Sequence, residues 1–260
     1  MEKEKRNQNN TYQNGIVLSG GAYRGMGQIG ALKALEEKGV KPDVLCGTSS
    51  GAINSVLYAS GYTPDEMADI WCKEPFGQVL ELHFPKFGLL RPARAGELMQ
   101  PYLKHDRLED LPIKTILCCS SMNNGKQKVL EKGNLLKILE ACCAVPVAFE
   151  PVEIDGEQCV DGGLVSNLPA EPLTGKCERL IGITVNPIPE KEELGGLRDT
   201  IVRTAWIALE STVDKTRQLC DWVIEPPELG RHGLTDRSAL DIFFNAGYEY
   251  TCHFLEEKGV

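Results

Sequence analysis

The chain has 260 residues, of which 42% are hydrophobic and 25% charged, and its formal net charge is −9 at pH 7. This length fits one large α/β domain that buries a substantial core. The acidic balance argues against a general nucleic-acid-binding protein. We therefore expect no nucleic-acid partner, and a polar, disordered tail over residues 1–13 followed by a single domain over residues 14–260.

The ten cysteines are not spaced like metal ligands. Cys118–Cys119 and Cys142–Cys143 are adjacent pairs within apolar runs, and the sequence contains no Cys-x-x-Cys. The N-terminus has no apolar signal-peptide core, and no stretch reaches membrane-spanning length. The sequence thus predicts buried thiols in a reducing cytoplasm, and neither a metal nor a cofactor.

Apolar periodicity predicts strands that alternate with helices along most of the chain. The expected strands and hairpins lie at residues 15–19, 44–46, 113–131, 151–160, 180–185 and 221–225. The expected helices are one that stops at Gly39, one that ends near Gly61, and those at residues 64–73, 96–104, 134–143, 197–219 and 238–257. This alternation predicts an α/β fold with a mainly parallel central sheet covered by helices on both faces.

A glycine-flanked serine follows the second predicted strand. A short apolar run leads into Gly47-Thr-Ser49-Ser50-Gly51, and the residues after it are spaced like a helix face. Strand, Gly-x-Ser-x-Gly and helix form the context of a nucleophile elbow, in which the glycines allow a sharp turn that exposes the serine hydroxyl. The same pattern also fits an ordinary glycine-rich turn. Ser49 is therefore a candidate nucleophile.

A second glycine-rich turn, Gly20-Gly21-Ala22-Tyr-Arg24-Gly, follows the first predicted strand. No Lys-Ser/Thr follows it, which excludes a Walker loop, and it lacks the middle glycine of a dinucleotide-binding turn. The alternative is that its backbone amides form an oxyanion hole beside the serine. Neighbouring parallel strands bring both turns to the same edge of the sheet.

Asp161, followed by two glycines, raises the question of how Ser49 is activated. An aspartate before two glycines is also typical of an ordinary turn. Ser49, Asp161 and then His232 or His253 stand in the chain order of an α/β-hydrolase triad. That fold places its elbow deep in the sheet, however, whereas only one strand here precedes the strand of the elbow.

Taken together, three motifs resemble the patatin-like phospholipases. They are residues 18–25 with the apolar helix after them, residues 47–52, and residues 141–146 followed by residues 161–169. The resemblance covers roughly residues 14–190, in the order and spacing of the family. It implies a three-layer α/β/α fold and a Ser-Asp dyad without histidine, with Ser49 as nucleophile and Asp161 as base.

The resemblance also implies an oxyanion hole from the amides of Gly20, Gly21 and Ala22, with Arg24 nearby. The other motif residues that support the site are Gly47, Ser50, Gly51, Gly162 and Gly163. The family loop usually has glycine where this chain has Ala22. If that position needs a positive φ, the alanine Cβ costs on the order of 1 kcal/mol.

An enzyme of this kind cleaves carboxylic esters of phospholipids or other lipids through an acyl-serine intermediate. Burial of Asp161 would raise its pKa and make it a usable base. Two alternatives stay open at this point. One is an acyltransferase that uses the same dyad, and the other is a lipid-binding or regulatory protein with an impaired oxyanion hole.

Residues 74–96 interrupt the α/β rhythm with prolines and aromatic side chains. Between residues 82 and 96 there are three bases, Lys86, Arg91 and Arg94, and no acid. One interpretation is a lid over the acyl pocket that makes transient contact with anionic lipid headgroups, so that the protein is cytoplasmic and peripheral at the membrane. The other is an ordinary surface loop that packs its aromatic side chains into the domain.

Overall fold

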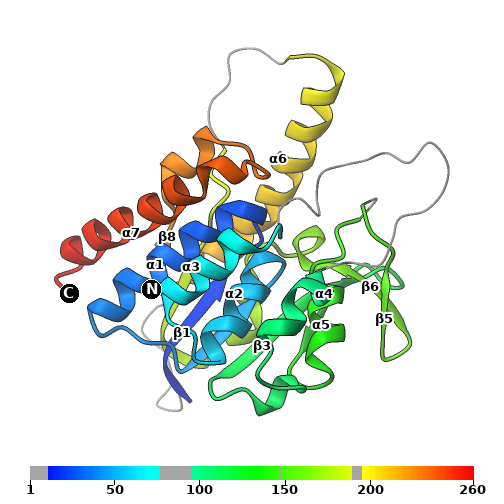
Figure 1. The fold of residues 1–260 in the computed structure, drawn as a ribbon, viewed down its shortest axis with the longest axis horizontal. Coiled ribbons are helices and arrows are strands. Elements are labelled where there is room, and N and C mark those ends of the chain that lie inside the picture. Colours follow the sequence, from blue (N-terminus) through cyan, green and yellow to red (C-terminus); the bar gives the residue numbers. More distant parts are fainter. Residues whose placement is uncertain (1–10, 77–94, 147, 189–194) are drawn as a thin grey trace.

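The computed structural model describes residues 11–76, 95–146, 148–188 and 195–260. Its centre is a sheet with the strand order β5-β6-β3-β2-β1-β7-β8, in which β4 pairs with β3 outside this path (Figure 1). The strands are β1 (Tyr12–Leu18), β2 (Val44–Gly47), β3 (Lys114–Ser121), β4 (Gln127–Leu130), β5 (Val152–Ile154), β6 (Glu157–Asp161), β7 (Cys177–Ile183) and β8 (Trp222–Ile224). The helices are α1 (Gly25–Glu37), α2 (Ser50–Ala59), α3 (Pro64–Lys73), α4 (Ala95–Met99), α5 (Leu135–Cys142), α6 (Leu197–Arg217) and α7 (Leu240–Glu257).

The sheet is parallel in its middle and antiparallel at one side. Strands β3, β2, β1, β7 and β8 pair in parallel, whereas β4 and β6 run antiparallel to β3 and β5 runs antiparallel to β6. The predicted α/β fold with a mainly parallel sheet is confirmed. The antiparallel side consists of the two predicted hairpins, because short turns can join only antiparallel strands.

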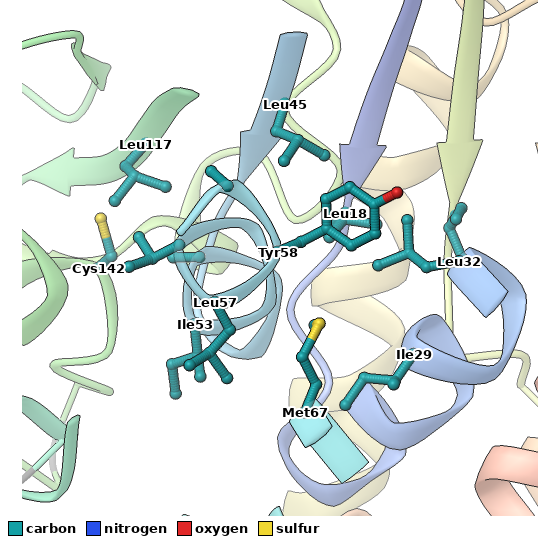
Figure 2. Close-up of a cluster of buried hydrophobic side chains, with 14 of the residues drawn as sticks. Leu18, Ile29, Leu32, Leu45, Ile53, Leu57, Tyr58, Met67, Leu117 and Cys142 are labelled. Carbon is teal, nitrogen blue, oxygen red and sulfur yellow. The ribbon is translucent and has the colours of Figure 1, made fainter. Parts of the chain in front are cut away.

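Apolar side chains cover both faces of the parallel strands. Alternate residues of a strand point to opposite faces, so that Ile16 and Leu18 of β1 belong to one buried cluster and Val17 to another. The larger cluster lies under α1, α2, α3 and α5, as Figure 2 shows for Leu18, Leu45 and the helix residues around them. The smaller cluster is closed by residues 168–173 and by α6. The helical layers therefore differ in size.

Helix boundaries follow the capping chemistry of the sequence. Thr63 accepts a hydrogen bond from the Glu66 amide and Glu66 accepts one from the Thr63 amide, which is the capping box that starts α3. Asn134 caps α5, and Gly39 follows α1 with a φ of 75°. These predicted boundaries are confirmed. At Thr63 and Asn134 a side chain satisfies an amide at the helix start, and at Gly39 the positive φ ends the helix.

Three expectations need correction. Strands β1 and β7 each begin three residues earlier than expected, because Tyr12 pairs with Cys177 and extends the central ladder into polar residues. The helix expected over residues 96–104 is α4 followed by a 3₁₀ turn at Gln100–Tyr102. Proline at position 101 has no backbone N–H and cannot continue an α-helical ladder.

Two predicted segments lie mostly outside the described residues. They are the polar tail, except for residues 11–13, and residues 77–94 of the basic and aromatic stretch.

The ten cysteines are free, and seven of them are buried. Across the described ranges, no helix combines the length and apolar character needed to cross a lipid bilayer.

Helices α1 and α7 touch backbone to backbone. A Cβ placed on Gly30 of α1 would lie 2.0 Å from the Phe244 carbonyl oxygen, and a Cβ on Gly247 of α7 would lie 1.9 Å from the Gly27 carbonyl oxygen. Both distances are far shorter than a carbon–oxygen contact allows. The two helices, side by side in Figure 1, can pack this closely only because glycines face each other.

We therefore expect Gly247→Ala to lower the free energy of unfolding by about 1–3 kcal/mol, the usual cost of forcing extra volume into a packed contact. Chemical denaturation measures this change. Gly233→Ala is the matched control, since no atom lies within 4 Å of its Cβ position. Equal stability of the two variants would contradict the proposed backbone contact.

Candidate active site

Ser49 stands in a tight turn between β2 and α2. Every residue from 44 to 60 is buried except Ser49. Its backbone has φ 53° and ψ −127°, a conformation that costs a non-glycine residue of order 1–3 kcal/mol. The Ser49 amide donates to the Cys142 carbonyl oxygen at 3.1 Å, which fixes the turn to the end of α5. The strand–turn–helix expected from the sequence thus exposes one side chain.

Glycines on either side of the serine allow the turn to close. A Cβ on Gly47 would lie 2.4 Å from the Gly51 carbonyl oxygen, and a Cβ on Gly51 would lie 2.2 Å from that of Leu18. Larger residues would separate α2 from the ends of β1 and β2. Ser50 is buried directly after the nucleophile candidate, with its Cβ next to Gly25 of α1. It fills space between the two helices.

The glycine-rich turn after β1 lies against Ser49. A Cβ on Gly20 would be 3.0 Å from the Ser49 Cβ. The Gly20 amide donates to the Asn167 carbonyl oxygen at 3.1 Å, so it is already occupied. Within the described ranges, the amides of Gly21 and Ala22 donate no hydrogen bond. Two of the three expected donors are therefore free to bind an anion.

Ala22 has a φ of 48°, so this position does adopt the positive φ that an alanine Cβ disfavours. Its Cβ therefore costs on the order of 1 kcal/mol at this position. The turn keeps this conformation because the Arg24 amide donates to the Gly21 carbonyl oxygen at 3.0 Å and a 3₁₀ turn follows at Ala22–Arg24. The alanine strains the loop while still presenting its N–H.

Asp161 comes close to Ser49 because β2 and β6 pair one after the other along the same edge of β3. Strand β2 pairs with β3 up to Gly47 opposite Leu117, and β6 then pairs along the same edge of β3, with Asp161 opposite Cys119. The last residue of β6 therefore lies just beyond the last residue of β2. This arrangement brings two residues far apart in sequence to the same end of the sheet.

The Asp161 side chain is buried, and its burial raises the pKa to about 6, while the Ser49 hydroxyl and the Gly163 amide lower it. The Gly163 amide donates to Asp161 Oδ1 at 2.8 Å. Among the described residues, the other oxygen, Oδ2, has no hydrogen-bond partner of good geometry. Ser49 therefore lies close to the carboxylate, but its hydroxyl makes no hydrogen bond of good geometry to Oδ2. Loose contacts of this kind are common in active sites before substrate binds.

The two glycines after Asp161 have distinct roles. A Cβ on Gly162 would lie 2.2 Å from Thr48 Oγ1 and 2.5 Å from the Cys118 carbonyl oxygen, so this position admits no side chain. Gly163 supplies the amide that holds the carboxylate. The Asp-Gly-Gly sequence is thus a requirement of packing and of hydrogen bonding.

Arg24 contacts α6 and the loop that carries His232. Its side chain is fully buried, donates through Nε and Nη2 to the His232 carbonyl oxygen, and lies 4.3 Å from the centre of the Trp206 ring. Burial lowers its pKa to about 10. Arg24 therefore connects the glycine-rich turn to α6 and to the loop that carries His232.

The histidines described in the structure are not arranged as a triad. The His232 ring lies 3.5 Å from Asp236, and the His253 side chain is 75% exposed beside Glu256 and Glu257. His105 is not part of this site either, and His83 lies outside the described residues. No described histidine hydrogen-bonds to Ser49 or Asp161.

A family model described as Patatin-like phospholipase matches residues 16–174, which include both glycine-rich turns and Asp161. The chain belongs to this family. A lysophospholipase, NTE1, of Saccharomyces cerevisiae is 21% identical over 93% of the chain, and an uncharacterized NTE family protein of Mycobacterium tuberculosis is 33% identical over 61% of it. The chain spans only 16% and 28% of the lengths of these two relatives.

The fold also matches the crystal structure of VipD from Legionella pneumophila. The TM-score is 0.52 at 13% identity, and the match covers 95% of this chain and 67% of that one. At this identity the likeness concerns the fold alone. It agrees with the layered sheet described above.

Three residues to which the sequence assigned no role complete the site, and of these only Asn186 lies outside the patatin-like motifs. Asn186 donates through Nδ2 to the Gly20 carbonyl oxygen at 2.6 Å, and the Cys143 thiol donates to the Ser49 carbonyl oxygen at 3.5 Å. Asn167, within a quoted motif but without a role, accepts from the Gly20 amide. Asn186 follows the predicted strand 180–185, and the rule that sites lie at carboxyl ends of parallel strands could have indicated it.

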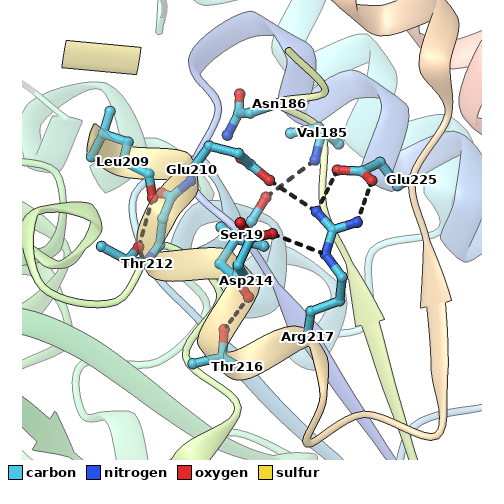
Figure 3. A network of polar contacts seen from close by, with 12 residues as sticks. Ser19, Val185, Asn186, Leu209, Glu210, Thr212, Asp214, Thr216, Arg217 and Glu225 are labelled. Atoms are coloured by element: carbon cyan, nitrogen blue, oxygen red, sulfur yellow. Dashed lines mark hydrogen bonds and ion pairs between the residues drawn. The ribbon is translucent and has the colours of Figure 1, made fainter. Parts of the chain in front are cut away.

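A partly buried ion-pair network links α6 to the residue after β8. Arg217 donates to Glu210 at 3.0 Å and to Glu225 at 2.5 Å, as Figure 3 shows together with Ser19, Val185 and Asn186. Burial raises the pKa of Glu210 to about 7. A second carboxyl group near the site therefore titrates close to neutral pH.

We expect the reactivity of Ser49 to rise with pH through a midpoint near the Asp161 pKa of about 6, because only the ionised carboxylate can accept the serine proton. The rate of labelling by a fluorophosphonate between about pH 5 and pH 8 measures this. Glu210→Gln removes the other neutral-range carboxyl group and should leave the midpoint in place. A midpoint near the ordinary aspartate value of about 4 would contradict the effect of burial.

Proposed function

We propose that this chain is a serine acyl hydrolase that cleaves carboxylic esters of lipids through an acyl-Ser49 intermediate. The observation that carries the proposal is a single one. Ser49 is the only unburied residue from 44 to 60, and its hydroxyl acts on the buried Asp161 carboxylate, whose pKa is about 6. The glycine-rich turn lies against Ser49, and two of its amides, those of Gly21 and Ala22, donate no hydrogen bond within the described ranges. Membership of the patatin-like phospholipases supports a lipid ester as the substrate class.

In the first half of the reaction, the Asp161 carboxylate accepts the Ser49 hydroxyl proton while Oγ attacks the ester carbonyl carbon. The carbonyl oxygen becomes an oxyanion and accepts hydrogen bonds from the Gly21 and Ala22 amides. The carbon–oxygen bond to the leaving alcohol then breaks, and Asp161 returns the proton to that alcohol. Ser49 is left as an acyl ester.

In the second half, water takes the place of the alcohol. Asp161 accepts a proton from the water molecule while the water oxygen attacks the acyl carbon. The amides of Gly21 and Ala22 bind the second oxyanion. The Ser49 oxygen leaves, recovers a proton and frees a carboxylic acid. Transfer to another alcohol would follow the same steps with the acceptor alcohol in place of water.

Apolar side chains beside the dyad support a lipid substrate. Leu164, three residues after Asp161, is 50% exposed. Leu209 of α6 lies 3.5 Å from the Cβ position of Gly163, which places α6 next to the dyad. Leucines at these two positions near the proposed nucleophile suit an acyl chain better than a polar substrate.

A lipid-binding protein without activity is the second candidate, because Ala22 strains the proposed oxyanion hole. Labelling of wild-type protein by a fluorophosphonate separates the two candidates. Covalent labelling at Ser49 supports the enzyme, and unlabelled serine in folded protein supports the binding protein.

Ser49→Ala and Asp161→Asn should each abolish hydrolysis of a p-nitrophenyl ester, and the double variant should be no worse than either one, because the two residues act as a unit. Steady-state kinetics measures the loss, and thermal melting shows that the variants are folded. Full activity of Asp161→Asn would exclude the dyad.

Substitution of each histidine by glutamine is the control for this experiment and should keep most of the activity. A loss of about 10³-fold at His232 or His253 in folded protein would instead support a catalytic triad.

We further propose that Lys86, Arg91 and Arg94 contact anionic lipid headgroups, on the basis of the sequence alone. Each base near an anionic bilayer contributes about 1 kcal/mol of binding. Replacing all three by Gln should weaken binding to anionic vesicles in a sedimentation assay and reduce hydrolysis there. Hydrolysis of a short soluble ester should not change, because the dyad is untouched. Parallel loss of both activities, or of neither, would contradict lipid contact.

A further inference from the structure

The Gly21 N–H can serve an oxyanion only if its peptide plane has the correct orientation. In a trans peptide the N–H points opposite to the preceding C=O. The direction of the Gly21 N–H is therefore fixed by whatever holds the Gly20 carbonyl oxygen. Two groups hold it: Asn186 Nδ2 at 2.6 Å and Ser19 Oγ at 3.0 Å.

Of these two groups, Asn186 donates the shorter hydrogen bond and belongs to a separate segment of the chain. It lies beyond β7, in the loop opposite the glycine-rich turn, and its side chain is 5% exposed. Its own backbone is fixed from α6, because Trp206 Nε1 donates to the Asn186 carbonyl oxygen at 3.3 Å. The Ser19 hydroxyl belongs to the turn itself and is held by the Val185 amide at 3.3 Å. Only Asn186 fixes the carbonyl from a separate segment.

The surroundings leave the Asn186 amide little freedom. A Cβ on Gly21 would lie 3.3 Å from Asn186 Oδ1 and 2.3 Å from Val185 Cγ2, so the two segments are in contact at this point. Asn186 Oδ1 is buried without a hydrogen-bond partner among the described residues. The amide thus keeps an unsatisfied acceptor while its donor is committed to the Gly20 carbonyl.

We propose that Asn186 is a positioning residue for the acyl hydrolase reaction: through the Gly20 carbonyl it orients the Gly21 N–H toward the oxyanion. This inference rests on the proposed function and adds a residue that lies outside the three motifs. Asn186 itself does not touch the reacting atoms. Its contribution is to the transition state, because the oxyanion forms only there.

Asn186→Leu removes the donor at nearly constant size. We expect kcat on p-nitrophenyl butyrate to fall about tenfold to hundredfold with KM within about twofold, since loss of a whole oxyanion donor costs about 10²–10³ in kcat. An alkyl trifluoromethyl ketone provides a second readout. Ser49 adds to its carbonyl carbon, the serine proton passes to Asp161, and the resulting oxyanion occupies the hole. Its Ki should rise by the same factor by which kcat/KM falls.

Asn14→Leu is the matched control. Asn14 is also a buried asparagine whose Nδ2 donates to a backbone carbonyl, that of Lys41 at 3.2 Å, but it lies near the beginning of β1. This variant should lose melting temperature while keeping kcat and the ketone Ki. A loss of kcat in both variants would mean that Asn186 acts through stability alone, and the proposal would be wrong.

Asn186→Asp keeps the shape and replaces the donor by an acceptor, and it serves where the leucine variant does not melt cooperatively. Wild-type kcat in either folded variant, or a reduced kcat with an unchanged ketone Ki, overturns the proposal. Fluorophosphonate labelling of the wild type separates this failure from that of the proposed function. Unlabelled wild type excludes the hydrolase and the inference with it, whereas labelled wild type with unaffected variants excludes only the role of Asn186.

Discussion

The site depends on a packing constraint at the carboxyl ends of β1, β2 and β3, where the backbone leaves no room for a methyl group. Gly51 lies against the end of β1, and Gly162 lies against both Thr48 and the Cys118 carbonyl. These contacts place Ser49, the Asp161 carboxylate and the glycine-rich turn close together. The proposed chemistry follows from this constraint, because close backbone contacts fix the turn of Ser49 and the start of the Asp-Gly-Gly segment.

Burial of Asp161 has opposite effects on reactivity and on stability. It raises the folded-state pKa to about 6, which makes the carboxylate a better base at neutral pH. The folded pKa then exceeds the unfolded value of about 4, so the native state binds the proton more tightly. Stability is highest below pH 4 for this group and decreases as the pH rises to 6, by about 3 kcal/mol in all. The ionised aspartate that the proposed reaction requires is therefore the less stable form of the fold.

Periodicity and capping residues predicted nearly all the elements, because Thr63, Asn134 and Gly39 act locally. Strand ends were less predictable, since Tyr12 joins β1 only through its pairing with Cys177. The residues of the candidate site also differ in whether a local sequence pattern predicts them. Ser49, Asp161 and the glycines were recognisable from their motifs. The engaged Gly20 amide and the Asn186 contact arise from segments that meet only in the folded chain, and no local pattern encodes them.

The glycine contact between α1 and α7 joins the helix after the glycine-rich turn to a segment near the other end of the sequence. Gly30 meets Phe244, and Gly247 meets Gly27. At about 5–20 residues per second, a ribosome needs on the order of ten seconds or more to add the residues between these partners. During that time α1 lacks its contact with α7. Translation thereby sets a minimum delay before α7 can pack against α1, the helix that follows the glycine-rich turn beside Ser49.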